Sequence, residues 1–196
     1  MGVRIAAVDF SKYREVGYGA GVAIYEWPDV VDLNKHLVQI AGYLAQRRVS
    51  RVDNAVKLIL YGFHLKEHGD LVDMYVKSLR RRHMVKVVSI PNPTTDTIVN
   101  ELRREDVEVV VFDTPSRDEM VYISDVRMRV GRVIVGKTHV VSISDIAAYY
   151  AALHSALQHR EIYGKATEVS KVYNKYNKIE KLKKLLKRLP HYLYPP

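Results

Sequence analysis

The 196-residue sequence contains no cysteine, and this absence excludes several kinds of chemistry. Without cysteine there can be no disulfide, no thiolate metal site and no cysteine nucleophile. The apolar runs are all far shorter than the ~18 residues needed to cross a bilayer, so no membrane partner is expected. The first residues carry a single arginine before a predicted strand, which does not match a secretory signal. The sequence therefore predicts a cytoplasmic protein.

Acidic residues are also scarce, with 22 Asp and Glu against 31 Lys and Arg, for a formal net charge of +9. Such an excess favours an anionic partner, of which nucleic acid, DNA or RNA, is the commonest. A generally basic protein without such a partner fits the same composition. The apolar fraction of 47% is ordinary for a globular chain with a real core.

Most of the positive charge lies near the carboxyl end. Residues 165–188 hold eight lysines and one arginine against two glutamates, which accounts for +7 of the net +9. Apolar residues recur there at steps of three and four, which predicts a basic amphipathic helix. We therefore divide the chain into an α/β domain, 1–163, and a basic helix with a tail, 164–196. The apolar stripe can dock on the body or on another subunit, as in a homo-oligomer, and a solvated helix without a partner also fits.

The chain opens with two predicted strands, 3–10 and 18–26, that should pair as an antiparallel hairpin. The first is expected to end in Asp9, at the rim of the sheet. Gly17 precedes the second strand and Gly19 and Gly21 lie at its start, where their lack of side chains would let a backbone or a phosphate approach closely. This glycine spacing does not match a dinucleotide fingerprint, and there is no Walker motif.

Strand and helix patterns alternate after the hairpin, which predicts an α/β fold with a mixed sheet covered on both faces. The run 56–63 reads as a mostly buried strand, although a helix over 52–63 also fits its spacing. The other predicted strands are 85–90, 107–113 and 132–136. The other predicted helices are 30–48, capped by Asp29; 70–83; one capped by Thr94 or Thr95 and ending near Arg104; 117–128; and one starting at Ser144-Asp145.

Three aspartates occupy positions where such sheets carry function. Asp9 and Asp113 follow buried strands, whose carboxyl ends form the functional edge of an open α/β sheet. Asp145 lies at the start of a late, alanine-rich helix. Capping alone would explain Asp145, and turn formation would explain Asp9 or Asp113. Three acids at such positions in one chain arise by chance less often than any one of them, which favours a shared site.

The opening Asp9 hairpin, the Thr94-Thr95 helix and the Asp145 helix together resemble the ribonuclease H-like superfamily, in particular Holliday-junction resolvases of the RuvC and YqgF type. The resemblance covers roughly residues 3–160 and implies a ribonuclease H-like mixed sheet flanked by helices. It implies hydrolysis of phosphodiesters by clustered carboxylates that hold Mg²⁺ or Mn²⁺. Asp9 corresponds to the ligand on the first strand and Asp145 to the ligand on the late helix.

The sequence departs from that pattern at the remaining ligands. No acid stands in Ser89-Ile90-Pro91-Asn92-Pro93, where proteins of the YqgF type place one. Glu67 and Asp70 are the nearest candidates for the resolvase glutamate. We prefer Asp113, because a residue at a strand end is more rigidly placed than a loop residue. If neither Asp113 nor one of these loop acids completes the metal site, the chain binds nucleic acid without cutting it.

Other groups are assigned supporting roles. A zinc site at His64 and His68 is a minor alternative, and His139 could assist proton transfer near Asp145. Phosphate contacts are assigned to Arg80, Arg81, Arg82, Lys171, Lys175, Lys178 and Lys184. The predicted function is a divalent-metal-dependent nuclease. The alternatives are a non-catalytic nucleic-acid-binding or assembly protein on a degenerate fold of this kind, and a Rossmann-like nucleotide sensor.

Overall fold

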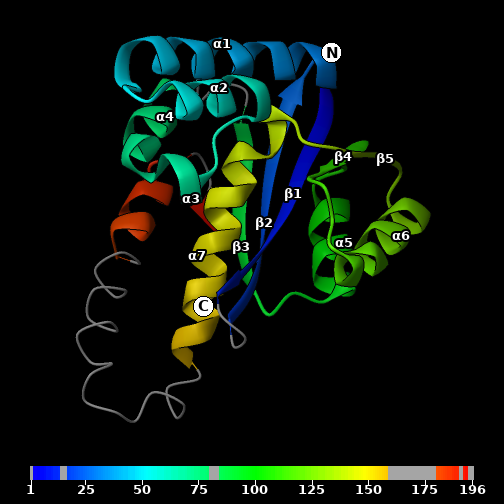
Figure 1. Cartoon of the computed structure of the whole chain (residues 1–196). Helices are drawn as coiled ribbons and strands as arrows, with labels where there is room; N and C mark the ends of the chain where they lie inside the picture. Colours follow the sequence, from blue (N-terminus) through cyan, green and yellow to red (C-terminus); the bar gives the residue numbers. More distant parts are fainter. Residues whose placement is uncertain (1, 14–16, 80–83, 159–179, 190–191, 194–196) are drawn as a thin grey trace, which may run out of the picture.

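The computed structural model describes residues 2–13, 17–79, 84–158, 180–189 and 192–193. Within these residues the strands form one sheet in the order β5-β4-β1-β2-β3-β6 (Figure 1). The strand bounds are β1 Val3–Tyr13, β2 Gly17–Trp27, β3 Met84–Pro91, β4 Val109–Phe112, β5 Arg132–Val135 and β6 Tyr192–Leu193.

The sheet is mixed. β1, β2 and β3 are antiparallel neighbours, whereas β4 pairs in parallel with β1 and β5 pairs in parallel with β4. The centre of β1 is buried on both faces, from Ile5 to Val8, which its unbroken apolar run requires. The predicted opening hairpin and the predicted mixed sheet are therefore confirmed.

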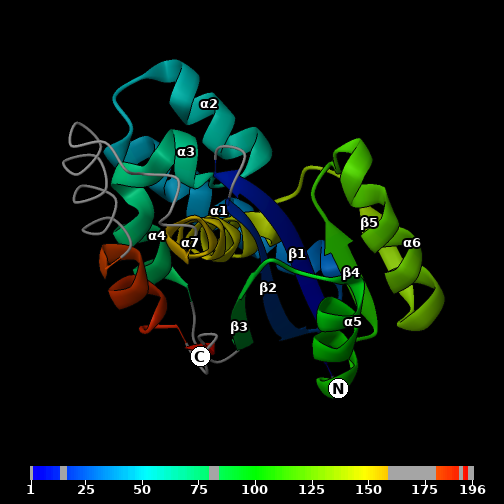
Figure 2. The same ribbon diagram turned by 90° about the horizontal axis from the view of Figure 1, so that it is seen from below.

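Helices cover both faces of the sheet, as Figures 1 and 2 show from two directions. One face packs against the larger core, which takes in α1, the segment from α2 to α4, and α7. The other face packs against α5 and α6 in a second core. The bounds are α1 Val30–Arg48, α2 Val52–Tyr61, α3 Leu65–His68, α4 Val72–Ser78, α5 Thr95–Arg104, α6 Met120–Arg129 and α7 Ser142–Gln158.

Two predicted helix starts are confirmed. The Asp29 side chain accepts a hydrogen bond from Asp32 N at 2.8 Å and caps α1. Thr94 caps α5, where its hydroxyl accepts from Thr97 N at 3.2 Å. These caps were predictable because they depend on residues three apart in the sequence.

The predicted strand 56–63 is wrong: this segment forms helix α2, close to the alternative helix 52–63. A buried strand would bury the apolar residues of this run on both of its faces, whereas only Leu58 of the helix is buried. The helix ends at Gly62, whose φ of +88° is readily available to glycine alone. The predicted helix 70–83 is confirmed in part: its first residues belong to the 3₁₀ turn η1 (Gly69–Leu71) and the next to α4, whereas residues 80–83 lie outside the described part of the chain.

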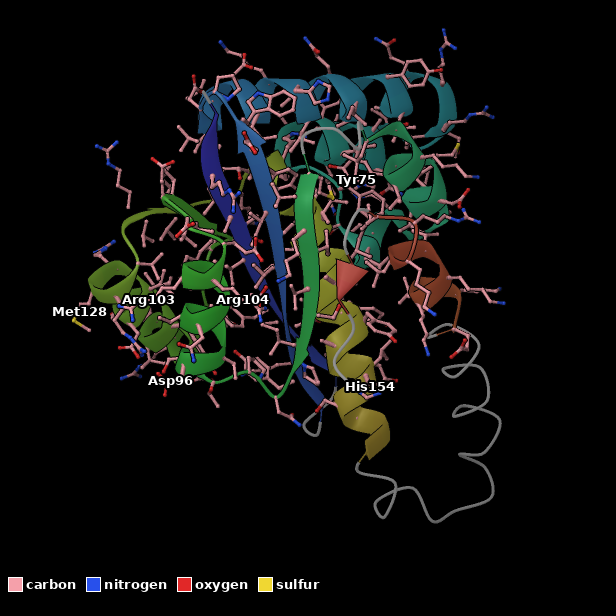
Figure 3. All side chains as sticks on the ribbon, turned by 180° about the vertical axis from the view of Figure 1, so that it is seen from behind. Tyr75, Asp96, Arg103, Arg104, Met128 and His154 are labelled. Atoms are coloured by element: carbon pink, nitrogen blue, oxygen red, sulfur yellow. The ribbon has the colours of Figure 1, made fainter. Side chains whose placement is uncertain are left out.

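α5 and α6 are linked to each other across the second face of the sheet. Figure 3 shows Asp96, Arg103 and Arg104 on α5, with Met128 on α6. The Arg103 guanidinium donates to the carbonyl oxygen of Arg129, its Nη2 at 2.7 Å, and Arg129 Nη1 lies 2.6 Å from Asp96 Oδ1. These contacts hold the two helices together on that face of the sheet.

Part of the predicted basic helix packs on the body of the protein. Residues 180–186 are helical, and Leu182, Leu186 and Leu189 are buried in the larger core. Arg188 Nη1 also lies 2.6 Å from Asp73 Oδ1 on α4. The remainder of this helix lies outside the described residues, so the boundary near residue 164 and the homo-oligomer through this helix stay predictions. Of the helices described, none has the length and apolar character needed to span a membrane.

Candidate functional site

Asp9 and Asp113 meet at the edge where β1 and β4 stop pairing. Their parallel register ends at the pair Val8 and Phe112, so each aspartate is the next residue of its chain. The expectation that Asp9 ends its strand is wrong, because β1 continues to Tyr13 alongside β2. Asp9 still lies where the parallel part of the sheet stops, and this register places it beside Asp113.

Asp145 reaches this edge because α7 lies directly on the glycines of β2. A Cβ on Gly21 would collide with the carbonyl oxygen of Ser144 and lie 2.5 Å from the backbone N of Ala148. A Cβ on Gly19 would lie 2.7 Å from the carbonyl oxygen of Ala148. The small residues predicted to admit a backbone or a phosphate therefore admit the backbone of α7. Since Gly21 pairs with Asp9 across the hairpin, the first turn of α7 comes to lie beside Asp9.

The carboxyl groups of Asp9 and Asp145 are in hydrogen-bonding contact. Asp9 Oδ1 also accepts from Phe10 N at 2.8 Å, and Asp145 Oδ2 accepts from Leu65 N at 2.7 Å. Burial raises the pKa of Asp9 well above its usual value, and the negative charges of Asp145 and Asp113 raise it further. Two acids from distant parts of the chain thus form one acidic pair.

The pKa of Asp145 is also raised, chiefly by burial. The amide of Leu65 and the nearby His64 oppose this rise, because both stabilise the negative carboxylate. These two groups begin α3, and sequence reasoning missed them at this site. They lie about eighty positions before Asp145 in the chain and have no local pattern that points to it.

Asp113 lies beside the pair and contributes repulsion to both acids. Its Oδ1 accepts from Thr114 N at 2.6 Å, as a turn-forming aspartate does. Across the described part of the chain, no group of three or more Asp, Glu, His or Cys residues converges closely enough to hold a metal ion. The structure therefore brings Asp9 and Asp145 together and leaves Asp113 as a neighbour.

The other candidate ligands do not join the acidic pair. Glu67 forms an exposed ion pair with Lys57 at 3.2 Å, and Asp70 is exposed in η1. The ring of His68 contacts the amide of His64 and the carbonyl oxygen of Asn54, so these two histidines do not share a zinc site.

His139 is buried, and its Nε2 lies 2.9 Å from the carbonyl oxygen of Ile59 at the end of α2. Burial lowers the pKa of His139. Its ring therefore contacts the backbone of α2.

Most of the predicted phosphate contacts fall outside the described residues, namely Arg80, Arg81, Arg82, Lys171, Lys175 and Lys178. Lys184 is described and is exposed on the helical segment 180–186. The assignment of these residues to phosphates stays a prediction.

No family model matches this chain, and no curated protein matches it in sequence. Among solved structures, it is similar to one described as the PCNA:RNase HII complex from Archaeoglobus fulgidus, with a TM-score of 0.42 and 14% identity, over 83% of this chain and 79% of that chain. It is also similar to ribonuclease H2 from Pyrococcus horikoshii, with a TM-score of 0.40 and 16% identity, over 83% of this chain and 78% of that chain. The narrower likeness to resolvases stays a prediction.

Proposed function

We propose that the chain is a divalent-metal-dependent nuclease that hydrolyses phosphodiester bonds in nucleic acid. One observation carries the proposal: the carboxyl groups of Asp9 and Asp145 are in contact, both with raised pKa values, at the carboxyl edge of the sheet. Groups with strongly perturbed pKa values concentrate at functional sites, because chemistry needs arrangements that stability alone would avoid. The ribonuclease H-like resemblance of the sequence supports the same function.

The chemistry of the pair fits a hard divalent cation. Two carboxylates in contact repel each other when both are ionised, and a cation between them would relieve that repulsion. Mg²⁺ and Mn²⁺ prefer oxygen ligands, and Mg²⁺ is commonly bound through one or two carboxylates together with substrate phosphate. Asp9 and Asp145 would hold the ion, and Asp113 would add negative charge beside it. A bound cation supplies an activated water and stabilises the leaving oxygen.

The chain's own residues supply the positioning. The Leu65 amide fixes one oxygen of Asp145, and the Phe10 amide fixes one oxygen of Asp9, so the remaining oxygens are presented in a set orientation. The positive charge of residues 165–188 would attract the phosphates of the substrate. A resolvase-like preference for branched DNA is the finer form of this proposal.

The test compares the wild type with Asp9→Asn and Asp145→Asn on branched DNA, duplex DNA, RNA and hybrid, with Mg²⁺ or Mn²⁺. Both substitutions should abolish cleavage and weaken Mn²⁺ binding measured by calorimetry. Asp96→Asn is the matched control, because it removes an exposed aspartate of α5 that pairs with Arg129 and lies outside the acidic pair. Cleavage that survives Asp9→Asn would refute the proposal.

A second candidate is a non-catalytic nucleic-acid-binding protein on a degenerate fold of this kind. The lack of a converging group of three ligands among the described residues favours it. This candidate predicts no cleavage on any substrate, together with binding that weakens steeply with salt and is unchanged in Asp9→Asn.

A further inference from the structure

Helix α2 carries an apolar face that the rest of the described protein leaves exposed. Val52 is 75% exposed, Val56 46%, Ile59 41% and Leu60 59%. We call these four residues the α2 stripe. A surface helix ordinarily turns such residues towards the core, and here only Leu58 is buried.

The α2 stripe is one continuous face. Its residues are four, seven and eight positions apart, and such residues lie one above the other along a helix. Leu58 lies on the opposite side of the helix, where it joins the larger core. The stripe therefore points away from the body of the molecule, and its length is about 15 Å for a ten-residue helix. An apolar face of this kind is typical of a helix that packs against another helix.

The charges beside the α2 stripe indicate which helix packs against it. Asp53 and Lys57 both flank the same side of it, one turn apart. When two copies of α2 pack antiparallel about a twofold axis near Val56, Val52 of each copy meets Leu60 of the other. In the same arrangement Asp53 of each copy lies on the same side as Lys57 of the other, about 3 Å from level with it along the helix axis, so each of the two symmetry-related contacts joins opposite charges.

We propose that α2 is a self-association surface through which two copies of this chain pair antiparallel. Lys57 already lies 3.2 Å from Glu67 in an exposed ion pair, so its ammonium can be shared with Asp53 of the second copy. This inference stands apart from the proposed nuclease function, because it uses none of the acidic residues at the sheet edge. Two helices of ten residues bury less than the ~800 Å² per partner of a standard interface, so the dimer is weak and depends on concentration.

The experiment is sedimentation equilibrium of the full chain over two orders of magnitude in concentration. The wild type should shift from monomer to dimer, and Leu60→Lys should remain monomeric. Met128→Lys is the matched control, because Met128 is an apolar residue of α6 that is even more exposed than Leu60, at 76%. Far-ultraviolet circular dichroism and the midpoint of thermal unfolding confirm that each variant is folded.

A charge exchange tests the antiparallel pairing itself. Asp53→Lys alone and Lys57→Asp alone should each weaken dimerisation about tenfold, since symmetry repeats each change in both copies. The double variant Asp53→Lys with Lys57→Asp should recover the dimer. A wild type that stays monomeric throughout, a Leu60→Lys variant that still dimerises, or a double variant as weak as the single ones would each overturn the proposal.

Discussion

Replacing Gly21 with alanine tests whether the close contact between β2 and α7 creates the acidic pair. The new Cβ would collide with the carbonyl oxygen of Ser144 and stand 2.5 Å from the backbone N of Ala148. Both obstacles are backbone atoms of a helix, so no side-chain rotation can relieve them. The first turn of α7 must therefore move away from the sheet, and Asp145 must move with it.

The expected loss of stability follows from the size of the group that is inserted. Inserting one methyl group into a packed core costs about 1–3 kcal/mol, and a clash with helix backbone belongs at the upper end of that range. For a chain of this length, about 3 kcal/mol lowers the midpoint of thermal unfolding by roughly 6–12 °C. Because contact between Asp9 and Asp145 is lost as well, Mn²⁺ affinity should fall together with stability.

Gly42→Ala is the matched control for this substitution. Gly42 lies inside α1, and a Cβ there meets nothing within 4 Å. Alanine is favoured over glycine in a helix interior, so this variant should gain about 0.5–1 kcal/mol. Differential scanning calorimetry gives the unfolding midpoint and isothermal titration gives Mn²⁺ affinity. The reasoning is refuted if Gly21→Ala unfolds within about 2 °C of the wild type, a change below 1 kcal/mol, and binds Mn²⁺ equally well.

Three further substitutions test the electrostatics. The folded pKa of Asp9 is raised, so the native state binds more protons than the unfolded state between the ordinary carboxyl pKa and the raised value. Without metal, urea unfolding at several pH values should therefore show stability falling as pH rises through that window, and Asp9→Asn should reduce the slope; an unchanged slope would contradict this. Lys86 lies 2.6 Å from Glu101 and 2.9 Å from Glu105 in a nearly buried cluster, so Lys86→Ala should cost about 3–5 kcal/mol in urea unfolding. Lys12→Ala, which removes an exposed ion pair, should cost less than about 1 kcal/mol, and an equal loss in the two variants would argue against the buried cluster.

The fold class was predictable because its main elements carry local patterns. The β-branched runs of β1, β3 and β4 and the helical spacing of α1 each identify their element from neighbouring residues alone. The segment 56–63 was mistaken because four successive apolar residues, Leu58 to Tyr61, fit a buried strand and a helix equally. Tertiary packing decides between them, since Leu58 joins the larger core and the α2 stripe stays in solvent.

The candidate site was predictable in its aspartates and not in its surroundings. Asp9 and Asp145 stand at positions that the hairpin and helix patterns identify, so each could be named from sequence. Their contact depends on how closely α7 approaches β2, which spacing does not reveal. His64 and the Leu65 amide reach Asp145 through the fold alone.

β4 and α7 lie far from β1 along the chain, and this separation affects the order in which the fold forms. The hairpin of β1 and β2 can form as soon as it is synthesised, but β4 and α7 follow only after residues 109 and 142. Non-local pairings of this kind are slow to form and complete late. The growing chain therefore cannot assemble the acidic pair before most of its length has left the ribosome. Until then the glycine face of β2 is open to wrong partners, so truncated chains should lack the acidic pair and be prone to aggregate.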